Sequence, residues 1–402
     1  MKIVISAASA KMGGALQYVG SVLRRLPSVA ADSQLLVFLP PETARKMKSV
    51  APQSVRLLPV SISHAAWWKR LWWDQVTLRR FLRKERVDVL FATGNFGMWR
   101  CPVRQILLVN NALYFSALYQ RLFVGKQSLP RRIALRLRRR LAIRSVRNAD
   151  VIMTPSRAML QDLRRFVDVA PEQALVNPYG ADPTGRASAP PSRTQDRASV
   201  RLLYVSLYAE HKNLVTLLKA IPLLNASGGP SFTLTTLANP AWEGARWTRT
   251  CQADLKLARQ RGIREFVQLV GPLDHAETLA LYHQADILVF PSLIESFGFP
   301  MVEGMAHGLP IVAADTRINH EICEDAALYF DSLDEADLAR RVLQLHRDRE
   351  LWAKLACAGQ RRATQRFRWE DHVQRLVRAA RAGTPADGPE EIRCKFLSPS
   401  LS

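Results

Sequence analysis

The 402-residue sequence is poor in cysteine, and its five cysteines follow no recognisable pattern. No Cys-x-x-Cys pair and no Cys/His spacing typical of a zinc site occurs among them. This argues against a structural zinc site. An odd number of scattered cysteines is also typical of a protein kept in a reducing compartment.

Long hydrophobic runs are missing as well. No stretch approaches the roughly 20 consecutive apolar residues that span a bilayer. The first residues, MKIVISAASAKMGG, contain an Ala-Ser-Ala that mimics a signal-peptidase site, but their apolar run is too short for a signal peptide and is typical of a first β-strand. We therefore expect a cytoplasmic protein, either soluble or peripheral on the cytoplasmic face of the inner membrane.

Acidic residues are few relative to basic ones. The chain has 57 Lys and Arg against 35 Asp and Glu, a formal net charge of +22. Such a charge attracts phosphate, whether in nucleic acid, anionic lipid or a phosphorylated small ligand. An arginine-rich composition whose charge is merely solvated explains the excess equally well.

Short apolar runs alternate with amphipathic segments along almost the whole chain. Runs such as KIVIS, QLLVFL and VDVLFAT are typical of buried strands, and LQYVGSVLRRL has helical spacing. The alternation predicts an α/β protein with two Rossmann-like domains and a cleft between the carboxyl ends of their strands. The expected boundaries are 1–182 for the first domain, 183–199 for a Pro/Ser/Gly-rich linker, 200–365 for the second domain, 366–382 for a C-terminal helix packing back on the first domain, and 383–402 for a tail.

The segment ESFGFPMVEGMAHGLPIVAAD, residues 295–315, directly follows DILVFPS, a run typical of a buried strand. Pro300 suits the first position of a helix, and Gly308 suits its C-terminal end. A helix N-terminus is a favourable place for an anion. The backbone amides expected there belong to Phe297, Gly298 and Phe299.

Two glutamates, Glu295 and Glu303, stand eight positions apart in this segment. Each has a structural explanation: Glu303 in the first helical turn would complement the helix dipole by a few tenths to about 1 kcal/mol, and Glu295 would be a solvated loop residue. A carboxylate is also suited to binding sugar hydroxyls, because it offers only acceptors. Taken alone, the segment leaves both explanations open.

The longer segment PSLIESFGFPMVEGMAHGLPIVAAD closely resembles the nucleotide-sugar donor motif of glycosyltransferase family 4, a retaining family of GT-B fold. That motif has a Glu, seven residues, a second Glu, a helix of small residues and Gly-x-Pro. The resemblance covers essentially the C-terminal half, from LVGPLDHAETLALYHQADILVFPS to RFRWEDHVQRLVRAA, and is looser in KMGG, VDVLFATGNFG and IMTPSRAMLQDL. It implies the GT-B fold, in which two Rossmann-like domains face each other across a cleft.

The resemblance also implies roles for these residues. Glu303 would accept hydrogen bonds from the donor ribose, Glu295 would contact the transferred sugar near its anomeric carbon, and the loop from Ser296 to Phe299 would face the sugar and the diphosphate. In the implied retaining reaction the leaving phosphate takes the acceptor proton, and the protein positions the reactants and stabilises the departing diphosphate. A hydrolase pair of carboxylates is the competing chemistry.

The phosphate-binding residues depart from the family pattern. Lys212 in YVSLYAEHKNL falls where the usual Lys stands, but Leu207 occupies the usual Arg position and Ser206 the usual Gly. His211, or a residue elsewhere, would supplement the weakened clamp. No Asp-x-Asp occurs, so a metal bridged by aspartates is not indicated.

Two further segments resemble parts of the family's cleft. Gly13 and Gly14 do not form Gly-x-Gly-x-x-Gly, but they resemble a double-glycine loop beside the donor phosphate and the acceptor; a turn that needs positive φ is an equal explanation. Asn110 and Asn111 stand where many relatives carry a cleft histidine. Asn110 is our candidate on the acceptor side, although an amide cannot act as a base.

Basic and aromatic patches indicate a further surface. Residues 119–148 hold nine arginines and one lysine with a partial apolar face, which fits a helix that docks on anionic lipid or binds a lipid-diphosphate acceptor; a plain solvated face is the alternative. Four tryptophans in AAWWKRLWWDQ fit either a membrane-facing helix or a helix with two of the four in the core: Trp67, Trp68, Trp72 and Trp73.

We therefore predict a metal-independent, retaining hexosyltransferase. It would move a hexose, with mannose as the guess, from a GDP- or UDP-linked sugar to a glycan or lipid-linked saccharide in surface polysaccharide or lipopolysaccharide synthesis. No cofactor beyond this nucleotide-sugar substrate is expected. The alternatives are a sugar-nucleotide epimerase of the same fold, which the Glu-x7-Glu motif disfavours, and a non-enzymatic protein that binds RNA or anionic lipid. No known nucleic-acid motif accompanies the charge.

Overall fold

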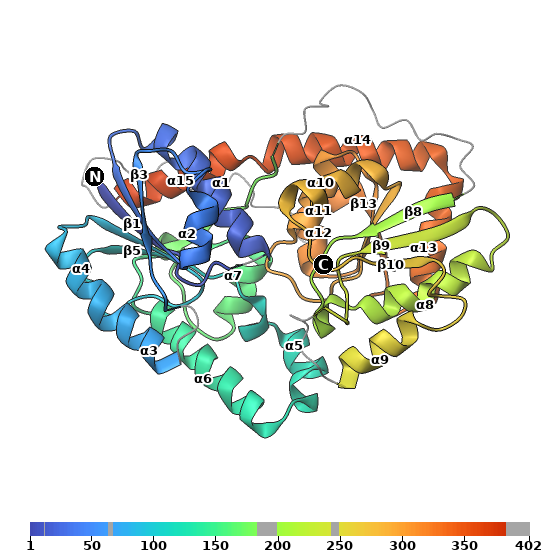
Figure 1. Ribbon diagram of the computed structural model, residues 1–402, viewed down its shortest axis with the longest axis horizontal. Helices are drawn as coiled ribbons and strands as arrows, with labels where there is room; N and C mark the ends of the chain where they lie inside the picture. The colour runs from blue at the N-terminus through green and yellow to red at the C-terminus, as the bar shows by residue number, and fades with distance from the viewer. Residues whose placement is uncertain (12, 63–66, 183–198, 243–248, 383–402) are drawn as a thin grey trace, which may run out of the picture.

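The computed structural model describes residues 1–11, 13–62, 67–182, 199–242 and 249–382. Within them the chain forms two parallel β-sheets, each flanked by helices (Figure 1). The predicted tail, 383–402, and all of the predicted linker except Ser199 lie outside the described residues; Ser199 is the first residue of the second sheet.

The first sheet has seven strands in the order β3-β2-β1-β4-β5-β6-β7, and all the pairs are parallel. Its central strands β1, β4 and β5 are almost wholly buried, as expected for apolar runs covered on both faces. The strands are β1 Lys2–Ser6, β2 Gln34–Leu39, β3 Val55–Pro59, β4 Val89–Thr93, β5 Arg104–Leu108, β6 Val151–Thr154 and β7 Ala174–Val176.

The second sheet has six parallel strands in the order β10-β9-β8-β11-β12-β13. Every residue of β11 and β12 is buried. The run DILVFPS therefore contains a central strand, β11, and the first residues that follow it. The strands are β8 Ser199–Tyr204, β9 Ser231–Thr236, β10 Val267–Leu269, β11 Ile287–Phe290, β12 Ile311–Ala314 and β13 Ala327–Phe330. This pair of doubly wound sheets confirms the predicted fold class.

Helices connect the strands of both sheets (Figure 1). Their bounds are α1 Gly13–Val29, α2 Pro41–Met47, α3 Trp67–Trp72, α4 Leu78–Lys84, α5 Ala117–Leu122, α6 Leu129–Val146, α7 Arg157–Arg164, α8 Leu214–Asn225, α9 Arg249–Ala258, α10 His275–Gln284, α11 Phe299–Ala306, α12 Arg317–Cys323, α13 Glu335–Arg347, α14 Arg349–Arg366 and α15 Trp369–Arg381. Among these described helices, none is long and apolar enough to cross a membrane.

The last helix, α15, belongs to the first sheet's domain although it comes at the end of the described chain. In Figure 1 it continues from α14 across to α1, against which it packs. The buried imidazole of His372 lies 3.0 Å from the hydroxyl of Tyr18 on α1, and Arg104 of β5 donates a hydrogen bond to the carbonyl of Ala379. The helix therefore completes a face of the first domain.

The segment that follows β7 and the segment that joins α14 to α15 lie side by side where the domains meet. There the Ala181 amide donates to the Phe367 carbonyl at 3.0 Å, and Gly180 is packed so closely on Trp369 that a Cβ would collide with its backbone. Around this point aromatic rings from both domains pack together: Tyr18, Tyr179, Phe297, Phe299, Phe367 and Trp369. This aromatic core joins the domains beside the cleft.

Candidate functional site

A cleft of about 490 Å³ lies between the two domains. Its walls come from the segments that follow β1, β4 and β5 of the first sheet and β8 and β11 of the second. These are carboxyl ends of parallel strands, where ligands bind in open α/β sheets. The second domain contributes His211, Lys212, Ile294, Glu295 and Ser296 to the wall.

Lys212 and Glu295 form an ion pair across the second-domain side of the cleft. The ammonium nitrogen lies 2.5 Å from Glu295 Oε1, and both side chains are largely buried. The turn that carries Lys212 is fixed by the Tyr204 hydroxyl, which donates to the Lys212 carbonyl at 2.8 Å. The Leu293 amide then donates to the His211 carbonyl, so the two loops are tied together. The predicted donor-site cation and the predicted sugar-contacting carboxylate therefore meet.

His211 adjoins this pair but does not add a second cation to it. Burial, and secondarily the charge of Lys212, lowers the pKa of the His211 imidazole to about 3. The ring is therefore neutral at neutral pH. It can form hydrogen bonds in the cleft, but the expectation that it supplements the positive charge of the phosphate clamp finds no support.

The double-glycine loop lies against the second domain. Gly13 has φ +59°, and a Cβ there would lie 3.6 Å from Leu207 Cδ1; a Cβ on Gly14 would lie 3.3 Å from the ring of Phe299. The departure at Leu207 thus gives an apolar contact where the family places an arginine. It lets the two loops approach closely, and the positive φ confirms that Gly13 serves a turn.

In the loop before α11, Ser296 lines the cleft, whereas Phe297 and Gly298 are buried and do not line it. Gly298 has φ +91° and precedes the first helical residue, Phe299, so Pro300 occupies the second helical position. The Phe297 ring is buried against Tyr179, and the Ser296 carbonyl accepts a hydrogen bond from Ser156 of the first domain at 2.7 Å. Any donor contact from Phe297 must therefore come from its backbone.

Glu303 is buried in α11, and neutral donors hold its carboxylate. The Tyr282 hydroxyl donates to Oε2 at 2.8 Å, and the amide of Gln17 on α1 donates to Oε1. Burial raises the pKa of Glu303 above its usual value. Glu303 stands in the second helical turn, because the helix begins at Phe299. The alternative that Glu303 only compensates the helix dipole from the first turn is therefore wrong.

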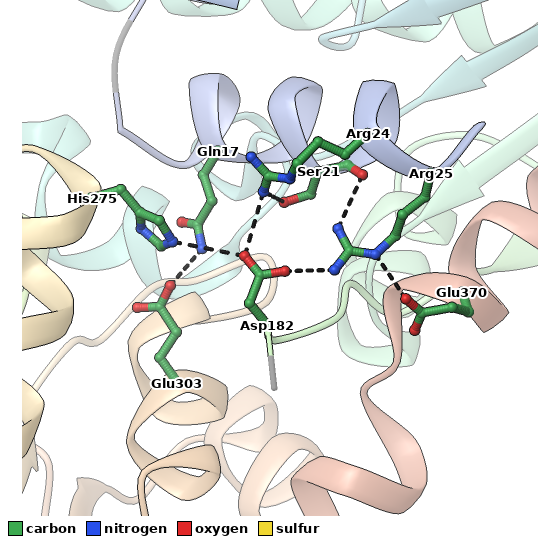
Figure 2. Close-up of polar contacts among 8 residues, drawn as sticks. All are labelled: Gln17, Ser21, Arg24, Arg25, Asp182, His275, Glu303 and Glu370. Atoms are coloured by element: carbon green, nitrogen blue, oxygen red, sulfur yellow. Dashed lines mark hydrogen bonds and ion pairs between the residues drawn. The ribbon is translucent and has the colours of Figure 1, made fainter. Parts of the chain in front are cut away.

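Gln17 of α1, which donates to Glu303, lies beside a charged network between the domains (Figure 2). At its centre is Asp182, which follows the first sheet. Its Oδ1 accepts from Arg25 at 2.7 Å, and its Oδ2 lies 3.4 Å from Arg24 and 3.9 Å from His275 of α10. Arg25 also donates to Glu370 of α15 at 2.8 Å. Helices from both domains therefore converge on one aspartate.

We expect Asp182→Asn to lower the free energy of unfolding at pH 7 by about 1 to 2 kcal/mol, allowing for partial solvent screening. The neighbouring His275 and Arg25 lower the pKa of Asp182 to about 2 from its usual 3.8. A carboxyl group whose pKa is lower in the folded state than in the unfolded state stabilises the fold at pH values above the unfolded-state pKa. This contribution is therefore lost as pH falls from about 4 to about 2. Urea unfolding at pH 7 measures the loss.

The control is Asp32→Asn, which removes an exposed partner of Arg381. We expect a smaller loss there than at Asp182. In Asp182→Asn the His275 pKa, which Asp182 raises, should also fall when followed by NMR. Equal losses in the two variants, with an unchanged His275 titration, would contradict the central role of Asp182.

On the first-domain side, the cleft wall is rich in amides. Asn110 and Asn111 line it, and both of their backbone amides donate to the side-chain oxygen of buried Asn95 at 2.9 Å. Asn110 Oδ1 also lies 3.4 Å from Asn95 Nδ2. The asparagine pair is therefore held by a third asparagine, which has φ +72° and follows Gly94.

Several residues of this region were missed by the sequence reasoning: Gln17, Arg70, Asn95, Asp182, His275 and Tyr282. Asn95 had a usable signal, since it follows a buried strand between two glycines in ATGNFG. Arg70 lines the cleft from α3, which sequence spacing alone does not place there. The rest come together only through the arrangement of the two domains.

Two family models match the chain in sequence order. The model described as Glycosyltransferase Family 4 matches residues 12–184, and Glycosyl transferases group 1 matches residues 199–348. The O-antigen chain mannosyltransferase B of Escherichia coli is 27% identical over 179 residues, which are 44% of this chain and 44% of that protein. The chain spans about half of the length of the curated relatives that it matches.

Solved structures show the same arrangement over nearly the whole chain. Sucrose-phosphate synthase from Thermosynechococcus elongatus has a TM-score of 0.72 at 18% identity, covering 95% of this chain and 98% of that one. Anabaena HepE in complex with UDP and glucose has a TM-score of 0.71 at 17% identity, covering 95% and 100%. These likenesses confirm the GT-B fold. With both models matched in order, the chain belongs to the family 4, group 1 glycosyltransferases.

Proposed function

We propose that this chain is a retaining hexosyltransferase that uses a nucleotide-diphospho-sugar donor. The observation that carries the proposal is the interdomain cleft where Lys212 and Glu295 pair beside Ser296, one turn of chain before the α11 N-terminus. One wall thus offers a cation and a carboxylate, and the N-terminus of α11 follows three residues after Ser296. Those three groups match a leaving diphosphate and the sugar attached to it.

The donor would bind mainly to the second domain. Glu303 would accept hydrogen bonds from the ribose hydroxyls, for which the Gln17 amide must give way, since it now occupies one carboxylate oxygen. Lys212 and the amides of the Gly298 loop would hold the diphosphate. Glu295 would then face the transferred sugar, near its anomeric carbon.

The proposed transfer needs no covalent intermediate with the protein. The bond between the anomeric carbon and the phosphate oxygen breaks, and the acceptor hydroxyl attacks that carbon from the same face. Its proton passes to the leaving phosphate oxygen. The protein's part is to align the two substrates and to stabilise the negative charge on the diphosphate through Lys212. Asn110 would position the acceptor hydroxyl, because an amide can bind it but cannot deprotonate it.

For the substrates, we propose mannose as the transferred hexose and a glycan or lipid-linked saccharide as the acceptor. The similarity to an O-antigen chain mannosyltransferase supports mannose and synthesis of a surface polysaccharide. We propose in addition that the reaction takes place at the cytoplasmic face of the membrane. The likeness to a protein solved with UDP and glucose supports a nucleotide-linked donor. UDP therefore stays a candidate for the donor nucleotide together with GDP. We further propose that the reaction needs neither a metal nor a cofactor.

A panel of nucleotide sugars tests the donor site directly. We expect one member of the panel, with GDP-mannose as first candidate, to raise the melting temperature by several degrees and to be slowly hydrolysed, with the same rate in EDTA. A panel in which no member shifts the melting temperature would refute the proposal. Conversion of the donor to its epimer, with no release of free sugar, would favour a sugar-nucleotide epimerase.

A further inference from the structure

Large hydrophobic side chains that are exposed to solvent gather on two helices of the first domain. Of the seven such side chains among the described residues, five lie on α3 and α6. Their exposed fractions are 55% for Trp68, 62% for Trp72, 63% for Leu129, 53% for Ile133 and 41% for Leu137. Concentrated exposure of this kind marks an interaction surface more often than scattered single residues do.

The spacing of these residues makes each set a continuous stripe. Trp68 and Trp72 are four positions apart on α3, and the three aliphatic residues follow each other at four-residue steps on α6, so each set lies on one helix face. Trp73, the next residue, is buried instead. One of the four tryptophans is therefore core and two are surface; the side chain of Trp67 lies outside the described residues.

The same face of α6 is strongly cationic. Exposed Arg136 and Arg140 stand three positions after Ile133 and Leu137, and so share their face. Residues 119–148 contain no acidic residue at all. In the described part of the chain, no arginine of α6 lies within salt-bridge distance of a carboxylate; Arg139 and Arg144 instead cover the rings of Phe166 and Trp99. The surface therefore combines apolar side chains with uncompensated positive charge.

This surface adjoins the cleft. Helix α6 packs against the turn Ala112–Tyr114, and both Tyr114 and Arg70 of α3 line the cleft wall. Burial raises the pKa of Tyr114, and the guanidinium groups of Arg138 on α6 and Arg70 on α3 oppose that rise, so each helix places an arginine near Tyr114. In Figure 1, α3 and α6 both lie along the lower edge of the first domain. The cleft thus opens beside the exposed stripes.

We propose that α3 and α6 dock the protein on an anionic lipid bilayer. The aliphatic and tryptophan side chains would enter the interface while Arg136 and Arg140 remain at the headgroup phosphates. With Arg70 on the cleft wall, the bilayer would deliver an acceptor carried on a lipid phosphate to the first-domain side. This last step rests on the proposed transferase function; the docking itself does not.

The pairing of apolar and basic residues favours a bilayer over RNA. Nucleic-acid phosphates would satisfy the arginines, but three aliphatic side chains one turn apart would gain nothing from a polyanionic backbone. An anionic bilayer offers a partner to both kinds of residue. Tryptophans next to cations are likewise typical of membrane interfaces.

Sedimentation of the full chain with vesicles tests the docking. We expect binding to vesicles of equal phosphatidylglycerol and phosphatidylcholine, little binding to pure phosphatidylcholine, and weakening as salt rises. A variant with Leu129→Ser, Ile133→Ser and Leu137→Ser should bind about tenfold more weakly or worse, and so should Arg136→Glu with Arg140→Glu. The nucleotide-sugar response of the melting temperature should stay as in the wild type for both.

The chain supplies matched controls. Among the described residues, Leu223 and Leu333 are the other two exposed large hydrophobics, and Arg259 and Arg347 are exposed arginines of the second domain. Serine at both leucines, or glutamate at both arginines, should leave vesicle binding unchanged. The docking is refuted if these controls weaken binding as much as the α6 variants, if neutral and anionic vesicles bind alike, or if the chain binds RNA but no vesicle. A persisting donor response in that case would leave the transferase proposal standing.

Discussion

Replacing Glu303 by glutamine is expected to remove the thermal stabilisation given by the nucleotide sugar, with donor affinity falling about 100-fold. The carboxylate is buried and can accept a hydrogen bond from a ribose hydroxyl at each oxygen. Each such bond to a charged group is worth roughly 1.5 to 3 kcal/mol, and an amide keeps only one acceptor oxygen. Titration of the melting temperature with donor measures the loss.

The same substitution should leave the protein's own melting temperature unchanged or higher. Burial raises the pKa of Glu303, so the folded state binds its proton more tightly than the unfolded chain does. The ionised carboxylate therefore costs folding free energy at neutral pH, and this cost disappears as pH falls below both pKa values. Glutamine carries no such cost. For donor binding the direction is opposite: affinity should decline as pH falls, with a midpoint above the usual value of 4.5.

Glu335→Gln is the control, since Glu335 is a more exposed carboxylate paired with Lys219 at 3.6 Å. It should keep the full donor response. A Glu303→Gln variant that loses the donor response only because it melts at a much lower temperature would show that Glu303 has a structural role, and the ribose assignment would fall.

Replacing Lys212 by methionine is expected to slow sugar transfer by about 100- to 1000-fold, as measured by donor hydrolysis or transfer at saturating donor. The ammonium group is the cation that this wall offers to the departing diphosphate, because His211 is neutral and Leu207 replaces the usual arginine. Losing one well-placed electrostatic group in a water-poor site costs several kcal/mol of transition-state stabilisation.

A double-variant comparison separates catalysis from folding. Lys212→Met leaves Glu295 largely buried and unpaired, so we expect it to cost about 2 kcal/mol of stability. Adding Glu295→Gln should restore most of that stability without restoring turnover. Lys219→Met removes the cation of a more exposed ion pair on the next helix. It should change both the stability and the rate of sugar transfer little. If the double variant regains activity together with stability, Lys212 acts only by supporting the loop.

The donor-side elements were predictable because they are local in the sequence. A buried strand, a loop with glycine and a short helix follow each other within the segment that contains Glu295 and Glu303, and strand and helix spacing fix their order. The sequence did not predict correctly in which turn of the helix Glu303 lies. It depends on Gly298 taking a positive φ, which makes Phe299 and not Pro300 the first helical residue.

The contacts between the domains were beyond reach of the sequence. Gln17 and Glu303 are 286 positions apart, and no local pattern relates them. The tryptophan cluster shows the same limit at shorter range. Helical spacing allowed either face to be the core, and only the position of the first sheet decides that Trp73 is buried while Trp68 and Trp72 are exposed.

The return of α15 to the first domain has a consequence for synthesis on the ribosome. The chain emerges from the N-terminus, and domains generally fold in that order. Here Tyr18 lacks its partner His372, and Arg104 of β5 lacks its partner Ala379, until α15 has been translated. That happens only after the whole second domain has been made. Nascent chains that stop before residue 369 would therefore hold a first domain with an uncovered apolar face, and only a chain that includes α15 can cover it.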